Sequence, residues 1–315
     1  MKVPQFTSHG MSRRDILKLS AAAGCAGLLP RWAISAEDST TMLKRRIPSS
    51  GEELPALGLG TSQVFDVGTA TAERAPLREV LRILVESGAS VVDSSPMYGR
   101  SEGVVGDLTA DMKMQNKIFY ATKVWTRGKE EGIRQMEQSL ARFQVDRIDL
   151  MQVHNLTDTA THLATLRDWK EAGRIRYLGV THYQSGAYDD LMRVIRNERL
   201  DFVQFNYSPL EAEAEEALLP LAADEGVAVI ANEPFDSGRA FSLTRGKPLP
   251  PWAADFDCAS WAQFFLKYIL GHPAVTCAIP GTSDPEHARD NLQAGFGRLP
   301  DEKTRVRMRA YLRDL

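Results

Sequence analysis

The feature that most constrains the fold is a regular alternation of short apolar runs with longer amphipathic segments, which begins near residue 57. The apolar runs have the length and composition of buried strands, expected at residues 57–60, 90–93, 118–123, 149–154, 177–181, 202–206, 228–232 and 276–280. The segments between them predict helices at 75–87, 130–143, 161–172, 188–198, 211–224 and 258–270, with a last helix at about 301–313. No linker rich in Pro, Gly or Ser interrupts the pattern.

Eight strands that are each followed by a helix predict an α/β fold of the (β/α)8 TIM-barrel type. A chain of 315 residues with 43% apolar residues is long enough to bury one such core. Residues 44–54 precede the first strand and predict an N-terminal hairpin that closes the barrel bottom. Gly88 and Gly173 follow two of the helices and are expected to end them in the left-handed conformation.

Charge and cysteine content exclude some classes of partner. The formal net charge is −3, and no cluster of Lys and Arg interleaves with aromatic residues, so we expect no binding to nucleic acid. The three cysteines, Cys25, Cys258 and Cys277, lack the spacing of metal ligands. We expect Cys258 and Cys277 to be small buried side chains, and no metal is required.

The first forty residues differ in composition from the rest. The segment SRRDILK at residues 12–18 leads into an Ala-, Gly- and Leu-rich stretch and resembles a twin-arginine (Tat) export signal. We expect residues 1–36 to be a signal peptide that the Tat machinery recognises, and the mature protein to be periplasmic or otherwise exported. The apolar stretch is too short for stable membrane insertion. An amphipathic N-terminal helix and a lipid anchor at Cys25 are the alternatives.

Four polar residues stand in or just after predicted strands: Asp93, Tyr98, Lys123 and His154. In a parallel barrel the carboxyl ends of all strands open onto one face, so these side chains can converge on a single pocket. Each residue alone has an ordinary structural explanation, such as a helix cap, a turn, a solvent-exposed lysine or a hydrogen-bonded core histidine. Their order along the chain is the stronger signal.

The segment VDSSPMYGRSE at residues 92–102, together with Lys123 and His154, resembles the D-x4-Y-G-x-S/N-E segment, lysine and histidine of the aldo-keto reductase superfamily. The resemblance covers residues 43–315. It implies a bacterial oxidoreductase that reduces aldehydes or ketones to alcohols with a nicotinamide cofactor. Asp93, Tyr98, Lys123 and His154 would then be its catalytic residues.

Carbonyl reduction needs a hydride at carbon and a proton at oxygen, and a free tyrosine holds its proton too firmly to serve well. We expect the Lys123 ammonium to lower the pKa of Tyr98 and so make it the general acid. Asp93 would hold and balance Lys123. His154 would bind the carbonyl oxygen and stabilise the charge that develops there.

The resemblance also implies a set of cofactor-binding residues: Thr61, Asp93, Thr181, His182, Gln204, Pro234, Phe235, Gly281, Thr282, Ser283, His287 and Asn291. Thr181 and His182 stand where Ser-Asn is usual in the family, and Asn232 stands where many members have a tyrosine that stacks under the nicotinamide. The turn at residues 279–291 is similar to the segment that binds the adenosine 2′-phosphate. The expected cofactor is therefore NADPH, with NADH less favoured. The same turn without a cofactor would be a helix cap at Ser283 or Asp284 ahead of Pro285.

Met97 and Trp125 are expected to wall an apolar substrate pocket that suits aldehydes and ketones with aromatic or aliphatic bodies; packing at the barrel rim is the alternative. Two other functions remain open. One is a non-catalytic nicotinamide-binding redox sensor or subunit on the same fold. The other is an aldolase that uses Lys123 as a Schiff base.

Overall fold

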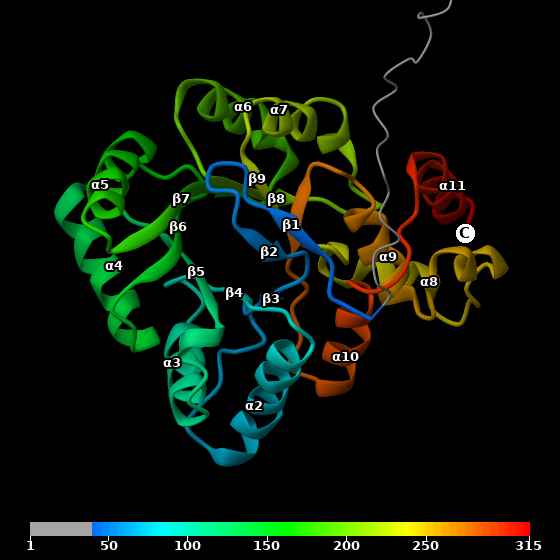
Figure 1. Ribbon diagram of the computed structural model, residues 1–315, viewed down its shortest axis with the longest axis horizontal. Coiled ribbons are helices and arrows are strands. Elements are labelled where there is room, and N and C mark those ends of the chain that lie inside the picture. Colours follow the sequence, from blue (N-terminus) through cyan, green and yellow to red (C-terminus); the bar gives the residue numbers. More distant parts are fainter. Residues whose placement is uncertain (1–39) are drawn as a thin grey trace, which may run out of the picture. The chain divides into compact units, whose positions relative to one another are not determined.

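The computed structural model describes residues 40–315, so the expected signal peptide at residues 1–36 lies outside the described residues. Figure 1 shows a ring of parallel strands surrounded by helices. The strands are β1 (Lys44–Arg46), β2 (Glu53–Pro55), β3 (Leu59–Gly60), β4 (Val91–Asp93), β5 (Phe119–Val124), β6 (Ile148–His154), β7 (Ile175–His182), β8 (Phe202–Asn206), β9 (Ala228–Asn232) and β10 (Val275–Ala278). All eight strands that the sequence predicts are confirmed, within two residues at each end.

Strands β3 to β10 form one eight-stranded sheet in chain order, and every pairing in it is parallel. Bridges between Leu57 and Ala278 and between Gly60 and Gly281 join the first strand to the last. The backbone N–H of Gly58 donates to the carbonyl of Ala278 over 2.9 Å. The sheet therefore closes into the predicted (β/α)8 barrel.

The α-helices cover the outside of the barrel (Figure 1). They are α2 (Thr71–Glu86), α3 (Ser101–Asp111), α4 (Lys129–Phe143), α5 (Thr159–Glu171), α6 (Tyr188–Asn197), α7 (Leu218–Asp224), α8 (Arg239–Thr244), α9 (Trp261–Leu270), α10 (Pro285–Gln293) and α11 (Glu302–Arg313). Short 3₁₀ turns are η1 (Gln115–Lys117), η2 (Ser185–Ala187), η3 (Glu213–Glu215), η4 (Asp236–Gly238) and η5 (Pro251–Phe256). Helices α3, α8 and α10 lie outside the predicted helix ranges, although a helix cap at the start of α10 was one of the expectations for that turn.

The predicted helix at 211–224 is wrong in its first half. Only η3 and α7 form there, and Ala217 between them has φ −147° and ψ −41°. Pro220 favours a break here, because proline has no N–H and its ring clashes with the carbonyl four residues earlier, which in a continuous helix would be that of Glu216. Gly88 (φ +81°) and Gly173 (φ +73°) do end their helices as expected.

The barrel interior is a separate apolar cluster that the N-terminal hairpin completes. Ile47 and Leu54, from the turn after β1 and from β2, are buried against inward-facing strand residues such as Phe119 and Phe202. The Tyr177 hydroxyl on β7 donates to Ser50 over 2.9 Å and so fastens the hairpin tip. Ile47 and Leu54 contact residues near the amino ends of the strands, so the predicted hairpin plug is confirmed and the carboxyl ends stay open.

The second and larger apolar cluster lies between the barrel and its helices, and it includes Cys258. Cys277 belongs to the barrel interior instead. Both are buried free thiols, as predicted. Among residues 40–315, no helix has the length and the apolar character needed to cross a membrane.

Candidate active site

The four candidate catalytic residues meet at the open end of the barrel. Asp93 is the last residue of β4, Lys123 lies in β5, and His154 is the last residue of β6. Tyr98 lies in the loop between β4 and α3. Asp93, Tyr98 and His154 line a cavity of ≈ 680 Å³, and Lys123 is fully buried next to Asp93. The structure therefore brings together the four residues that the sequence singles out.

The loop that carries Tyr98 depends on the residues that follow it. Gly99 has φ +60°, and a Cβ there would collide with the Asp66 carboxylate, which accepts the Arg100 N–H over 3.1 Å. Glu102 is buried at the start of α3, where it accepts a 2.6 Å hydrogen bond from Thr122 on β5. This local packing explains why the segment YGRSE needs glycine and glutamate at these two positions.

A buried ion pair forms the floor of the site. The Nζ of Lys123 lies 2.5 Å from Oδ2 of Asp93 and donates to the carbonyl of Ser94 over 2.7 Å. The second carboxylate oxygen accepts from Nε2 of Gln204 over 2.9 Å and from Gln152 over 3.3 Å. Burial alone would lower the pKa of Lys123, but the neighbouring Asp93 and Tyr98 raise it above its ordinary value. Lys123 is therefore held as an ammonium.

The electrostatics of Tyr98 differ from the sequence-based expectation. Its ring lies next to Lys123, with Nζ 5.2 Å from the ring centroid, and the ammonium favours the phenolate. Burial has a larger effect of opposite sign, so the pKa of Tyr98 is raised above its ordinary value. The expectation of a lowered pKa is thus wrong, because most of the phenol is removed from solvent.

His154 is fixed by Ser95. Oγ of Ser95 lies 3.1 Å from Nδ1 of His154, and the same oxygen accepts the N–H of Met97 over 3.4 Å. A Ser95 hydroxyl that donates to Nδ1 would place the imidazole proton on Nε2. Burial, followed by the charge of Lys123, lowers the pKa of His154 to about 3. The imidazole is therefore neutral near pH 7.

Of the predicted cofactor-binding residues on the central strands, some line the cavity and one does not. Thr61, Thr181 and Gln204 line the cavity, and the Thr181 hydroxyl donates to Gln204 over 3.3 Å. His182 does not line it. Side chains alternate along a strand, so Thr181 and Tyr183 face the cavity while His182 lies beside it, with its ring stacked on Tyr183 at 5.8 Å.

A second hollow of ≈ 370 Å³ continues the groove away from the catalytic residues. Gly281, Phe235 and Phe241 line both hollows, and Pro234 lines the first. The second hollow also has these predicted residues in its wall: Thr282, His287 and Asn291. Ser283 is exposed and lines neither one. Asp284 caps α10 by accepting the N–H of Glu286 over 2.8 Å, which is the structural role expected for this turn.

The mouth of the cavity is apolar. Five large hydrophobic side chains are exposed among the described residues, and four of them, Met97, Trp125, Tyr183 and Phe241, line this cavity. Met97 and Trp125 therefore lie where the sequence predicts the substrate pocket. Exposed apolar surface gathered at one concavity is typical of a binding site.

Several lining residues were not predicted from sequence. They include Asn155, Tyr183, Glu233, Ser237 and Phe241. Asn155 directly follows His154, and Tyr183 lies two residues beyond Thr181, so strand-end position and alternation were the available signals. The segment 233–241 had no such signal, because its placement depends on a loop in which Glu233, Asp236 and Ser237 all have positive φ.

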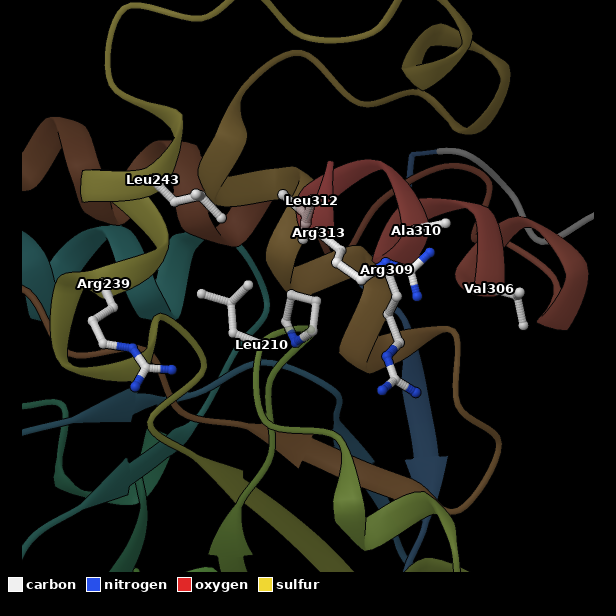
Figure 2. A pocket seen from close by; sticks show the side chains of 9 residues that line it. Leu210, Arg239, Leu243, Val306, Arg309, Ala310, Leu312 and Arg313 are labelled. Atoms are coloured by element: carbon white, nitrogen blue, oxygen red, sulfur yellow. The ribbon is translucent and has the colours of Figure 1, made fainter. Parts of the chain in front are cut away.

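A larger hollow, of ≈ 820 Å³, lies between α8, α11 and the loop after β8, away from the catalytic residues (Figure 2). Its polar side chains are Arg239, Arg309 and Arg313. Each of these arginines lies within 4.0 Å of a carboxylate oxygen, on Asp236, Glu215 and Asp314 respectively. Among the described residues that line this hollow, none is a carboxylate, histidine, cysteine or tyrosine, whereas the barrel mouth holds the four candidate catalytic residues.

Comparison with known proteins identifies the family. The sequence model of the Aldo/keto reductase family matches residues 56–306. The chain is 27% identical to Methylglyoxal reductase YeaE of Escherichia coli over 258 residues, which cover 79% of this chain and 89% of that protein. It is 25% identical to the uncharacterized oxidoreductase YqkF of Bacillus subtilis over 306 residues, or 83% and 94% of the two chains.

Solved structures show the same fold. An aldo-keto reductase from Klebsiella pneumoniae in complex with NADPH is 24% identical, with a TM-score of 0.71 over 86% of this chain and 96% of that one. The holo form of aldo-keto reductase AKR11C1 from Bacillus halodurans, also 24% identical, has a TM-score of 0.69 over 86% and 96%. With the family match spanning most of its length and the closed barrel beneath it, the chain belongs to the aldo/keto reductase family of oxidoreductases.

Proposed function

We propose that this oxidoreductase reduces aldehydes or ketones to alcohols with NADPH, with Tyr98 as the general acid. One observation carries the proposal: a buried Asp93–Lys123 pair lies beside a phenol and a neutral imidazole at the floor of an apolar-mouthed cavity. A protein that only binds a nucleotide has no need of a proton donor. When bound, the reduced nicotinamide supplies the hydride that is added to the carbonyl carbon.

The chain's own residues would handle the proton. The raised pKa of Tyr98 keeps its hydroxyl protonated at neutral pH, so the general acid carries its proton at the start of each turnover. As the proton leaves for the carbonyl oxygen, the adjacent Lys123 ammonium stabilises the phenolate that forms. Asp93, held by two glutamine amides, keeps Lys123 in place. Nε2–H of His154 would donate to the same carbonyl oxygen and orient it.

The groove fits an extended dinucleotide. The two hollows share a wall and run from Tyr98 to His287 and Asn291. Asn155 and Asn232 line the first hollow, and each has a buried side-chain oxygen without a hydrogen-bond partner in the described part of the chain. Those acceptors are suited to amide donors such as a carboxamide. The similar structure from Klebsiella pneumoniae, which holds NADPH, supports the same choice for this chain.

The preference for NADPH would rest on a weak phosphate site. Thr282, His287 and Asn291 are its polar groups, and Asp290 in the same wall carries a negative charge. His287→Arg adds a permanent cation there, so NADPH affinity should rise about fivefold to tenfold, while NADH affinity stays the same. Fluorescence titration of both nucleotides with both proteins checks this. An equal gain for NADH would show that residue 287 does not face the 2′-phosphate.

A non-catalytic nicotinamide-binding sensor is the second candidate. It is favoured by Asn232, which ends β9 at the cavity and offers no aromatic face for the nicotinamide. The deciding experiment titrates the protein with NADPH and then follows absorbance at 340 nm with aromatic and aliphatic aldehydes. Binding with turnover supports the reductase; binding without turnover supports the sensor; and no binding would contradict both.

We also propose that residues 1–36 direct export through the Tat pathway and that residues 43–315 form the reductase barrel of the exported protein. The SRRDILK segment supports this proposal. Replacing Arg13 and Arg14 together by lysine should keep the full-length precursor inside the cell, whereas the unchanged protein should be found, shortened, in the periplasmic fraction. Equal periplasmic amounts of both would contradict export by this route.

A further inference from the structure

We propose that Glu233 makes the substrate pocket charge-selective, so that carbonyl compounds bearing a negative charge are disfavoured relative to neutral and cationic ones. The proposal deepens the proposed carbonyl reductase function and rests on it. The motif at residues 92–102 does not point to Glu233, because Glu233 lies in the loop after β9 and is not one of the four candidate catalytic residues.

The charges that face the cavity leave Glu233 as an uncompensated anion. Among the described lining residues, the carboxylates are Asp93 and Glu233. Asp93 is neutralised by Lys123 at 2.5 Å, and the low pKa of His154 leaves that ring uncharged. Glu233 accepts one hydrogen bond, from Ser237 over 3.3 Å, and has no cationic partner in the described part of the chain. The pocket therefore carries a net negative charge.

The position of Glu233 lets this charge act on the bound substrate. Glu233 is about half-buried and shares the cavity wall with Trp125 at the mouth and Tyr98 at the floor. Burial is the main cause of the raised pKa of Tyr98, and Glu233 adds a small contribution of the same sign, so its charge reaches the proton donor. Burial raises the pKa of Glu233, as do the nearby carboxylates of Glu211 and Asp236, and the hydrogen bond from Ser237 opposes this rise. Asp236 is itself paired with Arg239, so Glu233 is the carboxylate in the cavity wall without a counter-charge among the described residues.

The loop backbone reinforces the placement. Glu233 has φ +48°, in the left-handed region that side chains other than Gly, Asn and Asp rarely adopt. Pro234 follows immediately and restricts the backbone further. The backbone at Glu233 and Pro234 therefore has little conformational freedom, so the fold fixes the point from which the carboxylate reaches the cavity.

The size of the effect follows from Coulomb's law. Two like charges roughly 8 Å apart, at an effective dielectric constant of about 30, change the ratio of two specificity constants by about tenfold. A carboxylate on the substrate should therefore be penalised by about that factor, and a quaternary ammonium group should be favoured by a similar one.

The test compares kcat/KM at pH 8, with saturating NADPH, for three benzaldehydes that differ at the para position: a carboxylate, its methyl ester and a trimethylammonium group. The proteins are the unchanged enzyme, Glu233→Gln, Glu233→Lys and the control Glu137→Gln. Glu137 is exposed on α4 and faces Arg174, outside the cavity. Two substitutions at residue 233 keep the test informative if one of them folds poorly.

The unchanged enzyme should prefer the ester to the carboxylate. Glu233→Gln should raise the carboxylate-to-ester ratio about tenfold, Glu233→Lys should raise it further, and Glu137→Gln should leave the ratio where it is. An unchanged ratio in both Glu233 variants overturns the proposal. So does a parallel change for all three aldehydes, which would mean that Glu233 acts on the cofactor. Absence of turnover with every aldehyde in the unchanged enzyme would overturn the proposed function itself.

Discussion

At the level of single residues, Ser95 determines how His154 presents its ring. The hydroxyl lies 3.1 Å from Nδ1, and we propose that it donates to Nδ1 and so keeps the ring proton on Nε2, the nitrogen proposed to face the substrate oxygen. His154 needs such help because burial keeps it neutral, with a pKa of about 3, so no charge selects its tautomer.

Ser95→Ala should therefore lower kcat about fivefold to tenfold with little change in KM, because the imidazole loses its fixed tautomer. Nitrogen-15 chemical shifts of His154 should show a mixture of tautomers in Ser95→Ala and a single one in the unchanged enzyme. Ser95→Thr, which keeps the hydroxyl, should restore both properties. Since His154 is already neutral above pH 3, kcat/KM should show no step near pH 6.5. A step there that disappears in His154→Gln would contradict this account.

The strand-end residues of the site could be predicted, whereas their energetics could not. Asp93 and His154 are the last residues of their strands, and parallel strands expose their carboxyl ends on one face. The raised pKa of Tyr98 depends on how much surrounding protein excludes water, which has no sequence signature. Glu233 was missed for a related reason: its place in the cavity depends on a loop in which Glu233, Asp236 and Ser237 have positive φ.

At the level of elements, α11 is anchored to the barrel by a buried polar cluster. Arg305 on α11 bonds to Glu215 in η3 and to the hydroxyl of Tyr207, and its Nε donates to the carbonyl of Tyr268 over 3.0 Å. Glu215 also accepts from Tyr207 over 2.6 Å. Burial raises the pKa of Glu215, but these hydrogen bonds and Arg305 outweigh it, so the pKa is lowered overall.

Glu215→Gln should cost about 1–3 kcal/mol of unfolding free energy, because it leaves the buried Arg305 without its counter-charge. Since the pKa of Glu215 is lower in the folded state, its contribution is present above the unfolded pKa of about 4.3 and is lost as pH falls through the folded value. The difference in melting temperature between the two proteins should thus be full at pH 7 and shrink below pH 4. Glu216→Gln is the control, because Glu216 is the exposed neighbour of Glu215. A comparable loss of unfolding free energy in Glu216→Gln would show that the buried polar cluster around Arg305 is not the cause.

Helix positions were less predictable than strand positions, and Pro220 shows why. Residues 211–217 consist of Ala and Glu alone, which favour a helix. Pro220 would lie in the third turn of a helix that began at residue 211, where it removes a backbone hydrogen bond, and only α7 forms after η3. Short elements such as α8 depend on packing against α9, through contacts such as that between Phe241 and Phe265 at 5.6 Å. Such tertiary contacts are not encoded in a local pattern.

At the level of the whole molecule, the residues that close the barrel and the candidate catalytic residues lie at opposite ends of the strands. The hairpin seals the amino ends of the strands, and the candidate catalytic residues lie at the carboxyl ends (Figure 1). Substitutions at the sealed end should therefore change stability and leave the pocket alone, as expected for this architecture.

Leu54→Ala tests that separation. It removes a side chain that is 1% exposed and should cost about 2–5 kcal/mol, or on the order of 5–15 °C in melting temperature. The kcat/KM for a neutral aldehyde, measured well below the melting temperature, should stay within about twofold. Glu53→Ala, its exposed neighbour in β2, should change neither quantity. A large loss of kcat/KM in folded Leu54→Ala would show that the two ends are coupled.

The most direct test of the catalytic account is Tyr98→Phe, assayed for NADPH binding and for aldehyde reduction in the same preparation. The substitution removes the proton donor and keeps the ring, so turnover should fall by about 10²–10⁴-fold while the Kd for NADPH changes by less than about threefold. Turnover close to that of the unchanged enzyme would contradict the role of Tyr98 as general acid.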